Sequence, residues 1–201
     1  TLDDFDVLQL NKLREIIRSN PGGEKTLLEL TNEELGLALR LISKDNDKLI
    51  PTMTGLLLLG KADSLARLVP TAKATFQVLE GTNVRVNEET SKPILEVLEL
   101  FQNYIKPWNP ENEFEYDLFR IPVPEFSYAA IREGLINAFC HRDYSMLGNV
   151  RVLIDDEGMS ISNPGGFIEG VNINNLLIVE QHGRNPALAD ALKRIGLAEK
   201  T

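Results

Sequence analysis

The sequence is poor in the features that define several protein classes. It has one cysteine, Cys140, so no disulfide can form within the chain, and this favours the reducing cytoplasm. An apolar run such as Leu56 to Leu59 is far shorter than the ~20 residues that span a bilayer. The 21 basic residues are outnumbered by 30 acidic ones, which gives a net charge of -9. Because such a surface repels phosphate backbones, generic nucleic-acid binding by this segment is disfavoured, and no membrane contact is expected.

What remains is the composition of a folded protein. The chain has 201 residues, 43% of them hydrophobic, with 14 glycines and 10 prolines. A chain of this length can bury the core of one large or two small domains. The first residue is Thr1 rather than methionine, so we expect a segment of a longer protein with neighbouring domains.

The first half predicts a mixed α/β subdomain. Residues 1–42 have helical periodicity, broken at residues 20–23, and Thr31 with Glu34 matches a capping box. Residues 49–59 are equally compatible with a short strand and a buried helix. Further along, we expect a core strand at 72–79 and a helix at 93–105.

The second half changes character after an acidic, proline-bounded stretch at 109–117. We take this stretch as a boundary between subdomains at 1–108 and 109–201. Beyond it we predict a helix capped by Ser127 and ending near His141, a hairpin around the turn at 155–158, and a last helix between Asn185 and Gly196. The acidic residues of that turn are read as turn chemistry, with cation binding as the alternative. The expected fold is α+β, with a two-layer α/β sandwich in the second half.

One stretch imitates a phosphate-binding loop. Gly55, Gly60 and Lys61 have Walker A spacing, but Ala62 stands where Ser or Thr would hold magnesium. Four leucines would also lie in an exposed loop, which wastes apolar burial of roughly 2 kcal/mol per side chain. We therefore assign the leucines to the core and Lys61 to the surface.

A stronger candidate lies on the helix that ends at His141. Glu133, Asn137 and His141 are spaced by four and share one side of a helix. Gly134 beside them costs helix propensity, and the small surface there would let a ligand or a backbone approach closely. The alternative is a solvated face with a tight helix contact at Gly134. His141 is equally suited to contacting a phosphate or the terminal carbonyl groups of its own helix.

Two further elements could complete a ligand site. The segment from Asn163 to Gly166 leaves a strand into a Pro-Gly turn with free amides. Arg184 precedes a helix N-terminus, where amides and the helix dipole favour an anion, so Arg184 is a candidate phosphate contact.

The order of helix, hairpin and glycine turn resembles the GHKL-type nucleotide-binding fold of histidine kinases and gyrases. A closer resemblance is to a bacterial family of RecG-related, Schlafen AlbA-associated predicted transcriptional regulators that carry this ATPase-like domain. It rests on the segments 51–61, 131–145, 163–166 and 184–186. The resemblance implies that Asn137 holds Mg²⁺, that Glu133 is the catalytic general base, and that Asn163, Gly165 and Gly166 line the base pocket.

The resemblance also has departures. Asn163 stands where these ATPases use Asp to read adenine, the second glycine-rich box has no match before Thr201, and no helicase motif is present. We expect a cytoplasmic, ATP- and Mg²⁺-binding regulatory module with at most weak ATPase activity, which meets DNA only through flanking domains. The alternative is a ligand-free scaffold, or a dimerisation module, that positions DNA-binding neighbours. A homo-oligomer is compatible with either.

Overall fold

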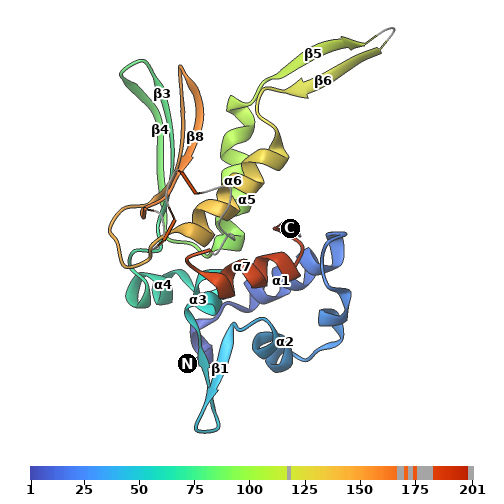
Figure 1. Ribbon diagram of the computed structural model, residues 1–201, viewed down its shortest axis with the longest axis vertical. Coiled ribbons are helices and arrows are strands. Elements are labelled where there is room, and N and C mark those ends of the chain that lie inside the picture. Colours follow the sequence, from blue (N-terminus) through green and yellow to red (C-terminus); the bar gives the residue numbers. More distant parts are fainter. Residues whose placement is uncertain (117–118, 167–169, 172–173, 176–182, 199–201) are drawn as a thin grey trace.

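The computed structural model describes residues 1–116, 119–166, 170–171, 174–175 and 183–198. It has the predicted α+β architecture, with helices packed around a mixed sheet and two hairpins that project from the body (Figure 1). The helices are α1 (Val7–Ser19), α2 (Asn32–Ala38), α3 (Met53–Leu59), α4 (Ala62–Leu68), α5 (Ile94–Ile105), α6 (Tyr128–His141) and α7 (Pro186–Arg194). The strands are β1 (Ile42–Asp45), β2 (Lys48–Pro51), β3 (Ala74–Glu80), β4 (Asn83–Thr90), β5 (Glu111–Tyr116), β6 (Phe119–Pro124), β7 (Val150–Asp155) and β8 (Gly158–Ser162).

The central sheet has the strand order β4-β3-β7-β8. Strands β3 and β7 are parallel, with Ala74 opposite Val150, and the two outer pairs are antiparallel. Burial alternates along β3 and β7, as expected when one face of a sheet packs against helices. Helices α5 and α6 contact this sheet and each other, which gives a two-layer arrangement of helices on a sheet that draws on both halves of the chain. The expected division at residue 108 stays a prediction, and the sheet takes two strands from each side of it.

Local signals set the helix starts in the first half. Asp6 accepts a hydrogen bond from the Leu8 amide, and the reciprocal bonds of Thr31 and Glu34 form the expected capping box. Thr52 caps α3 by accepting from the amide of Gly55 at 3.0 Å. Thr52 divides the ambiguous segment 49–59 into a strand and a helix. Strand β2 ends just before this residue, and helix α3 begins just after it.

The Walker-like stretch is helix α3 and not a loop. All four leucines from Leu56 to Leu59 are buried, whereas Lys61 is exposed beyond the end of the helix. Gly55 lies against the main chain of Leu41, where an added Cβ would come within 2.0 Å of the carbonyl oxygen. The structure thus confirms that the leucines belong to the core, and it gives Gly55 a packing role.

The second half forms the predicted helix, hairpin and last helix, and it adds a second hairpin that was not predicted. The acidic stretch at 109–117, expected as a boundary, contributes strand β5, which pairs with β6. Glutamate recurs at every second position from Glu111 to Glu115, alternating with Asn112, Phe114 and Tyr116, and this period of two is the strand signal that the acidic composition obscured. Among the helices of the described residues, none is long and apolar enough to cross a membrane.

Candidate functional site

Helix α6 presents the predicted polar stripe. The Asn137 amide nitrogen donates to Glu133 Oε1 at 3.2 Å, so these side chains face each other across one helical turn. Asn137 and His141 are exposed and Glu133 is half-buried. The second carboxylate oxygen of Glu133 is buried and has no hydrogen-bond partner among the described residues. A buried oxygen without a partner is costly, and a bound cation or water would satisfy it.

Gly134 serves the packing of the helix on the sheet. A Cβ at this position would lie 2.9 Å from the Cδ1 atom of Ile161 in β8. The space beside Gly134 is therefore filled by the Ile161 side chain, so a tight packing contact explains this glycine, and whether the polar stripe binds a ligand stays a prediction. This contact brings β8 alongside the polar stripe.

The Pro-Gly turn that follows β8 returns to the end of α6. The Asp143 amide donates to the carbonyl of Pro164 at 2.8 Å. Gly165 has φ +129°, which only glycine adopts readily, and a Cβ there would lie 3.6 Å from the His141 carbonyl oxygen. Asn163 donates through its amide nitrogen to the carbonyl of Pro164 at 3.3 Å, and Gly166 is exposed. The turn and the polar stripe therefore meet at the C-terminal end of α6.

Arg184 ties these elements together. It donates to Asp143 Oδ2 at 3.0 Å and to the carbonyl of Gly166 at 3.3 Å, while its buried Nε has no partner among the described residues. The hydroxyl and amide of Ser145, followed by Arg184, hold the pKa of Asp143 below its usual range. The predicted phosphate contact is thus already bound to an aspartate, and a phosphate would have to share it or displace it.

Asn185 has a different role from the one its sequence position suggests. It precedes α7 as predicted, but its side chain makes no capping bond to that helix. Instead its amide nitrogen donates to the carbonyls of Cys140 and Arg142, at 2.9 and 2.8 Å. Asn185 thereby satisfies these carbonyl groups at the end of α6.

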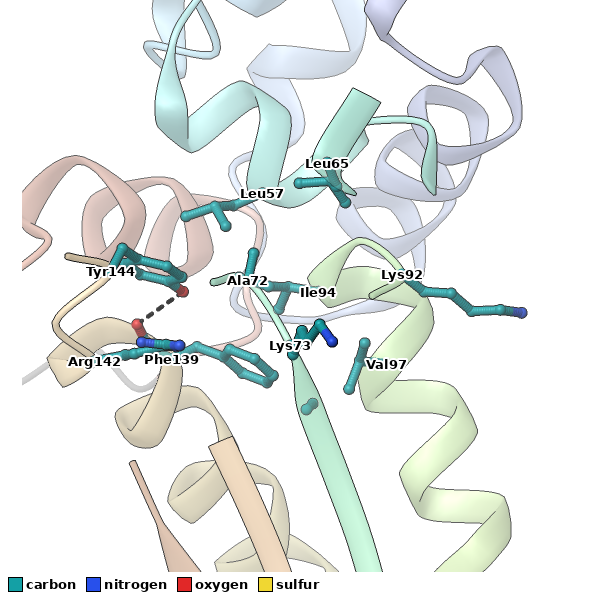
Figure 2. Close-up of a pocket in the computed structure, with 11 residues that line it drawn as sticks. Leu57, Leu65, Ala72, Lys73, Lys92, Ile94, Val97, Phe139, Arg142 and Tyr144 are labelled. Atoms are coloured by element: carbon teal, nitrogen blue, oxygen red, sulfur yellow. Dashed lines mark hydrogen bonds between the residues drawn. The ribbon is translucent and has the colours of Figure 1, made fainter. Parts of the chain in front are cut away.

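Arg142 is a supporting residue that the sequence did not reveal. Its side chain is 0% exposed and donates to the carbonyls of Thr71, Asp143 and Gly148. Its guanidinium lies 5.1 Å from the ring centroid of Tyr144, within range of a cation–π contact. Figure 2 shows both side chains beside a cavity of about 10 Å³, with the Tyr144 hydroxyl donating to Phe139. Arg142 thereby fixes the segment that carries Asp143.

The other acidic candidates are structural. In the turn between β7 and β8, Asp155 accepts from the Glu157 amide and Asp156 accepts from the Gly81 amide, which supports the reading as turn chemistry. Within the described ranges, no cluster of three or more His, Cys, Asp or Glu side chains could hold a metal ion.

Cys140 should be unreactive in the folded protein. Burial, followed by the charge of Glu133, raises the pKa of its thiol from 9.0 to about 12. Below both values the thiolate fraction falls by about 1000-fold, and the thiolate is the nucleophile. At pH 8 we therefore expect alkylation of native protein by iodoacetamide to be much slower than in urea, where the thiol is exposed. Equal rates in the two conditions would show that Cys140 is not buried.

Two protein families match separate parts of the chain. Residues 148–201 match the family described as "Putative ATP-dependent DNA helicase recG C-terminal", and residues 1–75 match a domain of unknown function, DUF8451. No curated protein matches the chain significantly.

One solved structure aligns with almost the entire chain. The crystal structure of the DIP2311 protein from Corynebacterium diphtheriae matches 99% of it at 26% identity with a TM-score of 0.77. The chain spans only 38% of that protein's length. The family match includes the turn at 163–166 and Arg184 but begins after α6. Together the comparisons support the fold, and they support a relationship of the C-terminal part to the RecG-related, ATPase-like family.

Proposed function

We propose that the polar stripe of α6, the turn at 163–166 and Arg184 form a nucleotide site, with ATP and Mg²⁺ as ligands. The observation that carries the proposal is the pair of Glu133 and Asn137. Its carboxylate has a buried oxygen without a partner among the described residues, and the pair is continuous with a glycine turn of exposed backbone. The match of residues 148–201 to an ATP-dependent family supports the choice of nucleotide.

The donors present fit magnesium. Mg²⁺ takes oxygen ligands and is commonly held by one or two protein groups together with substrate phosphates. The amide oxygen of Asn137 is such a group, and the neighbouring carboxylate of Glu133 stays available to accept a proton. When bound, the ion would neutralise charge on the phosphates. Asn163, Gly165 and Gly166 would line the base pocket, and His141 and Arg184 would lie beside the phosphates.

Hydrolysis, if it occurs, requires a base on this chain. Glu133 is the carboxylate of the stripe and can accept a proton from an attacking water. We infer a regulatory module of a cytoplasmic DNA-binding protein, in which flanking domains contact DNA. The net charge of -9 supports the assignment of DNA contact to flanking domains, because duplex DNA would repel the present segment.

Substitution of Asn137 tests the site. In the full-length protein, Asn137→Ala should remove the Mg²⁺-dependent part of ATP affinity, because alanine offers no oxygen to the cation. The fold should survive, since Asn137 is exposed. Calorimetric titration with ATP, with and without Mg²⁺, measures both. Asn112→Ala, an exposed asparagine on β5, is the matched control and should bind as the parent does.

Glu133→Gln separates binding from turnover. The amide keeps the shape of the side chain but cannot take a proton from water at neutral pH. ATP affinity should therefore stay within a few-fold of the parent, while phosphate release in a coupled assay should stop. If Glu133→Gln hydrolyses ATP at the parental rate, Glu133 is not the base.

A ligand-free scaffold is the second candidate. The observation that favours it is that Arg184 already donates to Asp143 and to the carbonyl of Gly166. These groups of the candidate site therefore bind one another instead of a ligand. If the parent, Asn137→Ala and Glu133→Gln all fail to bind ATP, the polar stripe is a solvated face and the scaffold is correct.

A further inference from the structure

Asp143 lies where the parts of the proposed nucleotide site meet. Its amide donates to the carbonyl of Pro164 in the turn after β8, and its Oδ2 accepts from Arg184 at 3.0 Å. The same turn packs closely on it, because a Cβ at Gly165 would lie 3.4 Å from the Asp143 amide nitrogen. A negative charge of the chain itself therefore lies beside the arginine that we assign to the phosphates.

The carboxylate of Asp143 has a different partner on each oxygen. Oδ2 accepts from Arg184, whereas Oδ1 accepts from the hydroxyl of Ser145 at 2.6 Å and from the Ser145 amide at 3.0 Å. The bonds from Ser145 hold the carboxylate in place when Arg184 moves away. They also lower the pKa of Asp143 more than Arg184 does, so the group stays ionised at neutral pH without the arginine.

Arg184 is able to exchange partners. It donates through Nη1 to Asp143 and through Nη2 to the carbonyl of Gly166, while its Nε has no partner among the described residues. The side chains of Arg184 and Asp143 are 29% and 22% exposed, so a dissolved anion can reach the pair. A guanidinium group is planar and its N–H donors match the oxygens of a phosphate as well as those of a carboxylate.

Arg142, the other cation near Asp143, cannot replace Arg184. It is buried, and it donates to the carbonyl of Asp143 and to those of Thr71 and Gly148, not to the carboxylate. When Arg184 turns to a phosphate, the carboxylate therefore loses the one described cation that contacts it. Its charge then lies close to the negative charge of the phosphate, and the two repel each other.

We propose that Asp143 competes with the phosphates of the ligand for Arg184. Arg184 leaves the carboxylate when a nucleotide binds, and the carboxylate, held by Ser145, stays beside the bound phosphates and weakens the affinity. This inference rests on the proposed function, because Arg184 is the phosphate contact of that site. Asp143 is thus a residue that sets the affinity of the site without contacting the base.

Neutralising the carboxylate gives opposite results for a competitor and for a structural residue. In the full-length protein, Asp143→Asn should bind ATP with Mg²⁺ about tenfold more tightly than the parent, because the repelling charge is gone and Arg184 is free. The amide oxygen of the new side chain can still accept from Ser145, so the fold should be kept, and thermal melting checks this. Unchanged or weaker binding of ATP in calorimetric titration overturns the proposal.

Asp156→Asn is the matched control for the loss of one negative charge. Asp156 is exposed in the turn between β7 and β8, where it accepts from the Gly81 amide, and an asparagine can accept the same bond. This variant should bind ATP as the parent does. If it gained as much affinity as Asp143→Asn, the effect would be one of net charge, and the proposal would be wrong.

A second substitution tests whether the effect acts through Arg184. In an Arg184→Gln background, the gain in ATP affinity from Asp143→Asn should fall from about tenfold to less than about threefold, because no arginine is left to compete for. A gain of the same size in both backgrounds would show that Asp143 acts on the ligand alone, and the exchange of partners would be refuted.

Inorganic pyrophosphate separates this inference from the proposed function, because it carries the charge of a nucleotide but has no base. If Asp143→Asn binds pyrophosphate more tightly than the parent, and no variant binds ATP more tightly than pyrophosphate, the competition is supported and the nucleotide site is wrong. If the parent binds ATP and Asp143→Asn binds it no more tightly, the nucleotide site stands and the competition is wrong. Failure of both ligands to bind any of these proteins overturns both.

Discussion

Gly55→Ala should destabilise the protein by about 3 kcal/mol or more. Glycine-to-alanine changes inside helices usually stabilise by up to ~1 kcal/mol, so the expected sign is opposite to the propensity effect. The reason is steric: the new Cβ would lie 2.0 Å from the carbonyl oxygen of Leu41 and 2.7 Å from the Phe5 ring. A clash with main chain cannot be relieved by a rotamer change, and overpacking of this kind is costly. Urea denaturation of parent and variant measures the loss.

Lys61→Ala is the matched control in the same Walker-like stretch. Lys61 is exposed, so its removal should change the free energy of unfolding by less than about 0.5 kcal/mol and leave any ATP affinity unchanged. If Lys61→Ala abolished ATP binding while the fold stayed intact, the stretch would be a phosphate loop after all.

Arg142→Met should cost about 3 kcal/mol of stability. Methionine fills a similar volume but supplies no donors, so the carbonyls of Thr71, Asp143 and Gly148 lose their charged partner. A buried acceptor left without a donor costs about 1–3 kcal/mol. Removing the buried charge also removes its desolvation penalty, which offsets part of that cost. Thermal and urea unfolding monitored by circular dichroism give the difference.

The control for Arg142→Met is Arg85→Met on β4. Arg85 is exposed and pairs with Glu80, and an exposed ion pair contributes about 0–1 kcal/mol. If the two variants lost the same small amount of stability, the Arg142 hydrogen bonds would not hold the segment that carries Asp143.

The parts of the fold that could be predicted are those set by local chemistry. The Thr31 and Glu34 box, the turn at 155–158 and the proline at the start of α7 each depend on a few neighbouring residues, and the structure contains all three. Segment 49–59 was ambiguous because its second part, residues 54–59, is buried throughout and has no periodicity to read. The β5–β6 hairpin was missed because acidic composition was weighed above alternation.

The candidate site was only partly predictable for the same reason. Spacing by four identified Glu133 and Asn137, because the contact between them lies within one helix. The roles of Arg142 and Asn185 depend on carbonyl groups that long-range folding brings close, such as that of Thr71, 71 residues before Arg142. No pattern in the sequence encodes such contacts. Arg184 stays a predicted site residue, and its bond to Asp143, which joins residues 41 positions apart, could not be read from the sequence.

We propose that α6 and the turn after β8 bind a nucleotide. Amide hydrogen–deuterium exchange of the full-length protein, with and without ATP and Mg²⁺, tests it most directly, because exchange reports which backbone segments a ligand protects. We expect slower exchange in peptides covering 133–141 and 163–166, and no change in the Walker-like stretch at 55–61. Protection at 55–61 alone, or no protection anywhere at saturating ATP, would contradict it.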